Sequence, residues 1–120
     1  MFYLNGGLPL KPVVLKENHD FRRLYSRGKY VVGSTLVTYC TKGKGNAVRY
    51  GITAGKKVGG AVERNRSKRV IREAFRALYP EITGSYDLVF VARTRTASVN
   101  MNDVAREMRR QLLKLKVICD

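Results

Sequence analysis

Histidine and cysteine are almost absent from this 120-residue sequence, which contains one His and two Cys. Cys40 and Cys119 lack the spacing of metal ligands, and one His cannot complete a metal site with them. Two cysteines also make no disulfide framework, so we expect reduced, buried thiols in a cytoplasmic protein. With 44% hydrophobic residues, the chain can form a single small domain without disulfide or metal.

Acidic residues are also few. The nine Asp and Glu residues are scattered along the chain, whereas metal-dependent protein nucleases need clustered carboxylates. His19 stands alone near the start of a predicted helix, so neither a His pair nor a Ser-His-Asp arrangement can be built on it. We therefore expect no catalytic residue, no bound cofactor or metal, and no small-molecule substrate.

Long apolar runs are missing as well. No segment approaches the ~20 apolar residues that cross a bilayer, and the amino terminus lacks the basic start and apolar stretch of a secretory signal. The exposed faces of the predicted helices carry no Trp and no paired bulky apolar residues, which argues against binding at a membrane surface.

Positive charge is what the sequence has in excess. It contains 24 Lys and Arg against 9 Asp and Glu, a formal net charge of +15. So much charge of one sign on a small domain repels itself, and we expect a polyanion to neutralise it in the working state. Nucleic acid is the first candidate for that polyanion.

The hydrophobic pattern predicts an α+β domain in which helices pack on a central mixed sheet, in the order α-β-β-α-β-α. Residues 1–16 are expected to be an extended lead-in, and residues 17–120 the α+β domain that binds nucleic acid. Asn18 is expected to cap the first helix and Asn100 or Asn102 the last. The first two strands are expected to form a hairpin around the turn at 42–46. The predicted elements are helix 19–27, strands 30–41 and 47–54, a helix ending near 79, strand 86–92 and a helix after 100.

The second predicted helix has an apolar face and a cationic face when residues 64–78 are placed at ~100° per residue. The apolar face holds Val70, Ile71, Ala74, Phe75 and Leu78. The opposite face holds Arg64, Asn65, Arg66, Lys68, Arg69, Arg72 and Arg76. Like charges four residues apart destabilise a helix, so a solvated surface explains this pattern less well than contact with phosphates.

A glycine-rich loop precedes this helix and carries Lys56 and Lys57. Its glycines let backbone approach a ligand, and a helix amino terminus attracts anions. The loop is not a nucleotide-binding P-loop, because three residues rather than four separate Gly51 from Gly55 and Lys57 occupies the Ser or Thr position.

The stretch GKKVGGAVERNRSKRVIREAF, residues 55–75, closely resembles the signature of the bacterial ribonuclease P protein component. That family is the small basic subunit of a ribonucleoprotein that removes the five-prime leader from precursor tRNA, with catalysis carried by the RNA subunit and Mg²⁺. The resemblance implies that this chain binds the catalytic RNA and precursor tRNA, and that its β-α-β crossover is left-handed. It implies RNA contacts by Lys56, Lys57, Arg64, Asn65, Arg66, Lys68, Arg69 and Arg72.

The resemblance also implies a cleft on the sheet that holds the single-stranded leader, lined by Phe21, Tyr25, Val37 and Tyr39. Aromatic surfaces beside positive charge suit single-stranded nucleic acid independently of the family. Phe21 and Tyr25 are spaced i, i+4, which is equally typical of core residues on a short helix.

Two other classes of RNA- or DNA-binding protein remain open from the residues alone. A ribosomal or other structural RNA-binding protein would show the same charge and a similar fold. A DNA-binding regulator would need a helix-turn-helix partner and polar base-reading side chains, and the cationic face offers charges suited to phosphates instead.

Overall fold

The computed structural model describes residues 12–43 and 45–119. It is an α+β domain built on a five-stranded sheet of order β1-β4-β5-β3-β2. The main elements are β1 (Val13–Val14), α1 (Asn18–Arg27), β2 (Lys29–Val32), β3 (Leu36–Lys42), β4 (Val48–Thr53), α2 (Ala61–Leu78), β5 (Tyr86–Ala92) and α3 (Met101–Lys114). Short 3-10 helices lie at η2 (Lys56–Val58), η3 (Tyr79–Glu81) and η4 (Thr94–Ser98).

Strand β5 is the centre of the sheet. It runs parallel to β4 and antiparallel to β3, so the hairpin expected around the turn at 42–46, between β3 and β4, is wrong. Alternating hydrophobicity identifies a strand but not its neighbour, and β5 takes the place between them. Helix α2 connects the adjacent parallel strands β4 and β5, and the left hand of this connection stays a prediction.

The predicted strand 30–41 is two strands. β2 and β3 pair antiparallel, with Tyr30 opposite Tyr39, and the turn between them is closed by the Gly33 amide donating to the Leu36 carbonyl at 2.9 Å. Helix α1 begins one residue earlier than expected. Its N-cap is Glu17, which makes no side-chain capping bond, so Asn18 is not the cap. Of the predicted lead-in, residues 1–11 lie outside the described residues.

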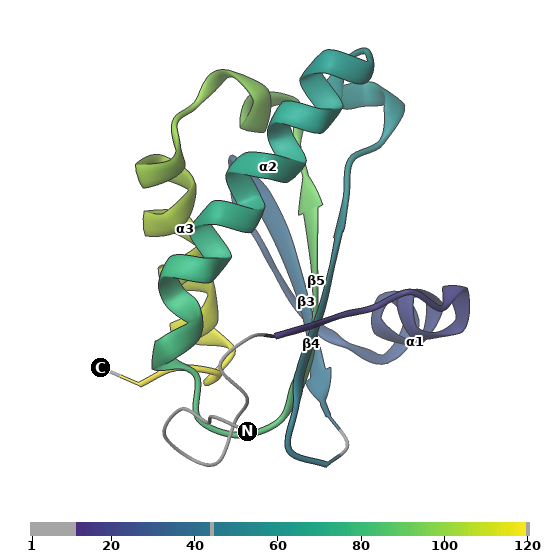
Figure 1. Ribbon diagram of the computed structural model, residues 1–120, viewed down its shortest axis with the longest axis vertical. Helices are drawn as coiled ribbons and strands as arrows, with labels where there is room; N and C mark the ends of the chain where they lie inside the picture. Colours follow the sequence, from purple (N-terminus) through teal and green to yellow (C-terminus); the bar gives the residue numbers. More distant parts are fainter. Residues whose placement is uncertain (1–11, 44, 120) are drawn as a thin grey trace.

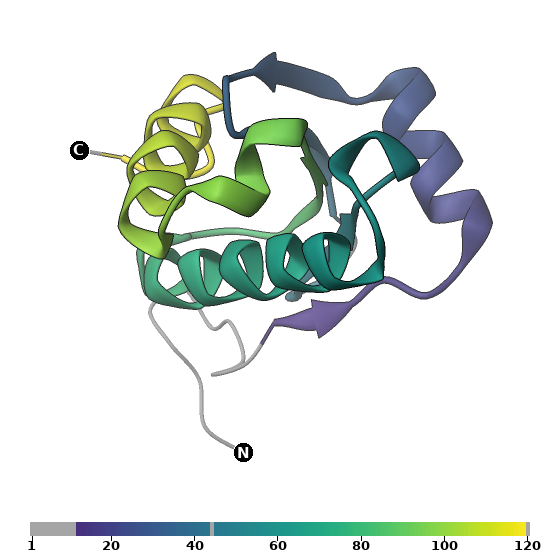
Figure 2. The same cartoon turned by 90° about the horizontal axis from the view of Figure 1, so that it is seen from above.

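The two faces of the sheet are covered by different helices. Figure 1 shows α2 and α3 together on one side of the strands and α1 on the other, and Figure 2 shows the same separation from above. The main core lies under α2 and α3, where the whole predicted apolar face of α2 is buried. A smaller cluster of Leu15, Leu24 and Val89 lies under α1.

Helix α3 joins the main core as expected, with Val104, Met108 and Leu112 fully buried. Asn100 caps it by accepting a hydrogen bond from the Asp103 amide at 2.9 Å. The helix ends in a left-handed residue, Lys116, with φ of 62°. The Val117 amide donates to the Leu112 carbonyl and the Lys116 amide to the Leu113 carbonyl, which is a Schellman motif with lysine where glycine is usual.

The two thiols are free but differ in exposure. Cys40 is buried, and Cys119 is exposed, contrary to the expectation that both are buried. Burial, together with the nearby negative charge of Asp87, raises the pKa of the Cys40 thiol to about 11. Among the described residues, no helix combines the length and apolar character needed to cross a membrane.

Candidate nucleic-acid interface

The cationic face of α2 is displayed because the apolar face is fixed in the core. The buried residues recur at helical spacing from Val70 to Leu78, which turns the remaining positions outward. Asn65, Arg66 and Arg69 are exposed, and Arg64, Lys68 and Arg72 are partly buried. Ser67 is also buried, where its hydroxyl donates to the Glu63 carbonyl at 2.9 Å. The helix therefore presents a continuous basic surface over its first three turns.

The charges on this surface are not neutralised within the described part of the chain, where none of these side chains forms an ion pair with a carboxylate. The hydrogen bonds they make are to backbone. Arg66 Nε donates to the Ala97 carbonyl at 2.9 Å, and Arg64 Nε reaches the Gly60 carbonyl at 3.4 Å. These bonds orient the guanidinium groups and leave their charge uncompensated.

The loop before α2 places two more cations at the helix amino terminus. Lys56 and Lys57 are exposed on η2, while Val58 is buried and anchors the turn. Gly59 has φ of 139°, and a Cβ there would lie 2.9 Å from Cβ of Glu63. This conformation is available to glycine alone, so the glycine-rich pattern fixes where the two lysines stand.

An open cleft of about 580 Å³ adjoins this loop. Apolar side chains of Val32, Val37 and Val91 form part of its lining on the sheet, and Lys56, Lys57 and Arg93 supply charge. Val37 was predicted for the leader cleft. The structure places it beside the predicted RNA-contact lysines.

Three tyrosines continue the same face of the sheet. The ring of Tyr39 lies 5.0 Å from that of Tyr25, edge-on, and 5.5 Å from that of Tyr30. Tyr25 is 44% exposed and Tyr30 is 62% exposed. We call Tyr25, Tyr30 and Tyr39 the tyrosine patch. It lies next to the cleft because Val37 and Tyr39 project from the same face of β3.

Phe21 has a different environment from the other predicted cleft residues. It packs on β4, where a Cβ at Gly51 would lie 2.5 Å from its ring. The ring is partly buried against the small cluster under α1. Phe21 thus belongs to the contact that seats α1 on the sheet, and it shares that face with the tyrosine patch.

Sequence reasoning missed Tyr30, Val32, Val91 and Arg93 on this face. Tyr30 joins the patch only through its register opposite Tyr39, which a predicted single strand could not reveal. Alternation in β5 would have placed Val91 on the face opposite Phe90. Arg93 is positioned by a hydrogen bond from Nη1 to the Gly33 carbonyl at 3.0 Å.

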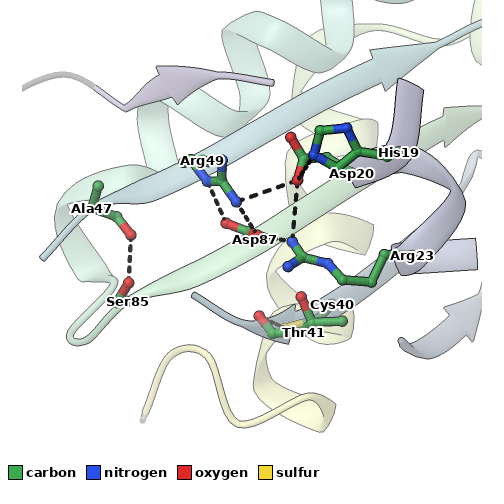
Figure 3. Close-up of polar contacts among 9 residues, drawn as sticks. All are labelled: His19, Asp20, Arg23, Cys40, Thr41, Ala47, Arg49, Ser85 and Asp87. Atoms are coloured by element: carbon green, nitrogen blue, oxygen red, sulfur yellow. Dashed lines mark hydrogen bonds and ion pairs between the residues drawn. The ribbon is translucent and has the colours of Figure 1, made fainter. Parts of the chain in front are cut away.

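Helix α1 is fastened to the sheet by a charge cluster of Asp20, Arg23, Arg49 and Asp87 (Figure 3). Asp87, on the central strand β5, is 1% exposed. Arg49 donates two hydrogen bonds to the Asp87 carboxylate, from Nε to Oδ1 at 2.9 Å and from Nη2 to Oδ2 at 2.6 Å. This hydrogen bonding raises the pKa of Arg49.

The cluster joins α1 to both β4 and β5. Arg23 of α1 also pairs with Asp87, and Asp20 lies 3.6 Å from Arg49. These contacts fix α1 across part of the sheet and so position Tyr25 in the tyrosine patch. Within the described residues, no group of three or more His, Cys, Asp or Glu side chains is arranged to hold a metal ion.

Comparisons with known proteins agree with this geometry. A family model described as Ribonuclease P matches residues 10–116. The ribonuclease P protein component of Clostridioides difficile is 40% identical over 96 residues, which cover 79% of this chain and 84% of that protein.

Solved structures give the same result. The RNase P protein of Staphylococcus aureus superposes with a TM-score of 0.78 at 32% identity, covering 91% of this chain and 100% of that chain. The RNase P protein of Thermotoga maritima superposes with a TM-score of 0.67 at 28% identity, covering 84% of this chain and 92% of that chain. These matches decide between the hypotheses that the residues left open. The chain belongs to the ribonuclease P protein component family, the RNA-partnered protein subunit of a ribonucleoprotein endoribonuclease that matures tRNA.

Proposed function

We propose that the chain binds two RNAs with two adjoining surfaces in the cytoplasm. The cationic face of α2 and the loop at 55–60 bind the catalytic RNA and nearby precursor tRNA. The cleft and the tyrosine patch hold the single-stranded five-prime leader. No side chain of the protein takes part in the cleavage chemistry, for which the RNA subunit supplies the catalytic groups and requires Mg²⁺.

The observation that carries the proposal is the uncompensated charge on α2. Seven cations and an amide on α2 and its preceding loop have no carboxylate partner in the described chain, and the loop adjoins an open cleft. Guanidinium groups bind phosphate oxygens with two parallel hydrogen bonds, which suits the irregular backbone of folded RNA. Neutralising several phosphates also releases counterions, so binding should depend steeply on salt.

The cleft supports the leader assignment through its chemistry. Bases stack on aromatic rings with roughly 1–3 kcal/mol each and with little regard to sequence. Tyr25 and Tyr30 leave part of their rings exposed, and Tyr39 lies between them. Lys56, Lys57 and Arg93 lie at the cleft where the phosphates of a bound strand would need cations.

The protein's contribution to the reaction is then electrostatic and positional. Cations between two RNA chains reduce their mutual repulsion, which strengthens substrate binding and lowers the Mg²⁺ concentration the assembly needs. A leader fixed on the sheet orients the scissile phosphate toward the catalytic RNA.

Reconstitution tests the proposal directly. The protein is mixed with a bacterial ribonuclease P RNA and precursor tRNA at low Mg²⁺, and leader removal is compared with that by the RNA alone. We expect faster cleavage and tighter precursor binding with the protein. Equal rates with and without it would refute the assignment.

Replacing Arg64 and Arg66 with Ala tests the α2 surface. We expect weaker assembly with the catalytic RNA and a salt slope reduced by about 1.8, since each lost duplex phosphate contact contributes about 0.9. Arg22→Ala with Arg106→Ala removes the same charge from exposed positions on α1 and α3 and serves as the control. An unchanged slope in the α2 variant would show that this helix faces solvent in the complex.

Tyr39→Leu tests the leader site separately. It keeps apolar contact on the sheet and removes the ring, so precursor tRNA should bind several-fold more weakly, in line with roughly 1–3 kcal/mol per stacked base. Mature tRNA, which has no leader, is the matched ligand. The same loss for both ligands would place Tyr39 outside the leader site.

A further inference from the structure

A second basic site lies at the opposite end of the sheet from the loop at 55–60. It is an open pocket of about 390 Å³ whose lining includes Arg27, Lys29, Lys42, Tyr86, Leu115 and Lys116. We call it the distal pocket. Its four cations come from the last residue of α1, the first of β2, the last of β3 and the second residue beyond α3.

The strand register fixes the separation of the two basic sites. Lys42 and Val48 pair with Tyr86 at one end of the sheet, whereas Val37 and Thr53 pair with Val91 at the other. The five residue steps along β5 from Tyr86 to Val91 correspond to ~17 Å. One phosphate group cannot reach both sites, so the distal pocket is not an extension of the α2 surface.

The distal pocket has the chemistry of a nucleic-acid site. Its four cations are exposed, and within the described residues none of them pairs with a carboxylate. No acidic side chain stands among its described lining residues, and Tyr86 and Leu115 add an apolar wall. Lys116 is held there with left-handed backbone. Cations beside an aromatic ring suit a phosphate with its attached base.

The edge strand β2 connects this pocket to the tyrosine patch. β2 is the last strand of the sheet, and its successive side chains point to opposite faces. Tyr30, the cross-strand partner of Tyr39, projects to the sheet face covered by α1. Lys29, the cross-strand partner of Cys40, projects to the other face. A single strand that stacks on Tyr30 and leaves the sheet over β2 meets Lys29 and Arg27 first.

We propose that the distal pocket binds phosphates of the upstream part of a long precursor leader, after the leader has crossed β2. This inference rests on the proposed leader site and adds to it a second binding region that only long leaders reach. Short leaders end on the tyrosine patch. The protein should therefore favour long-leader precursors through cations that touch neither the catalytic RNA nor the tRNA body.

The test compares two leader lengths with a variant of the distal pocket. Lys29→Gln with Lys42→Gln removes two exposed cations without breaking an ion pair, and Lys16→Gln with Arg22→Gln removes the same charge elsewhere. Binding of precursor tRNA is measured for holoenzyme reconstituted with each variant. The precursors carry leaders of about five or about fifteen nucleotides, lengths that span the range of typical single-strand binding sites.

We expect the distal variant to bind the long-leader precursor about three- to tenfold more weakly, with a salt slope lower by about 1.4 for two contacts. Short-leader binding and the control variant should match the wild type. Equal losses for both leaders would overturn the proposal and would indicate that the pocket contacts the tRNA body or the catalytic RNA. No loss with either leader would also overturn it, because the pocket would then bind no RNA. Wild-type stimulation of cleavage, measured in parallel, reports on the proposed function independently.

A footprint provides a measurement without substitutions. Amine acetylation of the wild-type holoenzyme, read by mass spectrometry, should slow at Lys29, Lys42 and Lys116 when the long-leader precursor is bound. Lys16 serves as the internal reference. Unchanged acetylation of all three lysines with the long leader bound would overturn the proposal.

Discussion

The two faces of the sheet use the same strands for different purposes. On the face under α2 and α3, β5 contributes Leu88, Phe90 and Ala92, all buried in the main core. On the face under α1, it contributes the paired Asp87, the buried Val89 and the partly exposed Val91. The first face is closed by two helices and the second is left partly open.

The number and length of the covering helices explain the difference. α2 and α3 have 18 and 14 residues, about 27 and 21 Å, whereas the 10 residues of α1 span only ~15 Å. A five-stranded sheet is ~19 Å across its strand axes, and one helix covers a strip ~10 Å wide. About half of the α1 face therefore stays open, and the tyrosine patch and the cleft lie on that face. Buried apolar contacts are concentrated on the closed face, and the proposed leader site lies on the open face.

The largest expected effect is on the closed face. Phe75 is fully buried between the rings of Tyr50 and Phe90, so Phe75→Ala should lower the free energy of unfolding by about 3–5 kcal/mol. Tyr30→Ala, at a 62% exposed position of the open face, should change it far less. Denaturant unfolding of both variants measures the difference. Equal losses would mean that stability is shared by the two faces.

The charge cluster is the exception on the open face. Asp87→Asn removes the buried partner of Arg23 and Arg49, and we expect a loss of about 2–4 kcal/mol because two guanidinium groups lose their shared carboxylate. Leader binding should also weaken, since Tyr25 depends on the seating of α1. Val91→Ala, on the same face of β5, is the control for the stability measurement. A loss below about 1 kcal/mol would show that water replaces the carboxylate there.

Glu107 links stability to pH. Its carboxylate accepts from the Thr35 and Leu36 amides at 2.8 and 3.2 Å and from the Ser34 hydroxyl. Burial opposes ionisation, but these hydrogen bonds outweigh it and lower the pKa of Glu107 below its ordinary 4.5. The stabilisation by ionised Glu107 is therefore fully present above pH 4.5, and it is lost as the pH falls through the lowered pKa of Glu107 in the folded protein.

Urea unfolding from neutral to acid pH measures this contribution. Glu107→Gln should be less stable at neutral pH and should lose less stability on acidification. Asp103→Asn, at the more exposed first turn of α3, is the control. If the free energy of unfolding fell with pH in parallel for the wild type and Glu107→Gln, Glu107 would not contribute to the acid response.

The smallest expected effect is a gain. Lys116 is a non-glycine residue with left-handed backbone, so Lys116→Gly should raise the free energy of unfolding by up to about 1 kcal/mol. Lys114→Gly, at the last residue of α3, should instead destabilise by up to about 1 kcal/mol. Thermal unfolding distinguishes the two. A loss at Lys116 would mean that its side chain contributes more than the backbone strain removes.

The sequence predicted features that repeat within a short window. The apolar face of α2 was confirmed residue by residue because the 3.6-residue period is local. The strand predicted at 47–54 was confirmed for the same reason, with Val48 and Tyr50 buried in the main core and Ile52 packed against it. The RNA contacts assigned to individual residues stay predictions.

Features that depend on distant partners were not predictable. β5 lies between β3 and β4, although it begins more than forty residues after β3 ends and more than thirty residues after β4 ends. Asp87 is buried because Arg49 and Arg23 neutralise it from 38 and 64 positions away. Tyr30 joins Tyr39 only through a turn hidden inside a β-rich run. Local hydrophobic patterns carry no information on these pairings.

The central place of β5 has a consequence during synthesis on the ribosome. Until residues 86–92 leave the exit tunnel, β3 and β4 have no strand between them, and each exposes an unpaired edge. The sheet therefore cannot be completed until β5 has left the tunnel, and before then the exposed strand edges must stay unfolded or be shielded by a chaperone. Folding then proceeds by insertion of a strand into a gap, an event of long sequence separation that is slow by its topology.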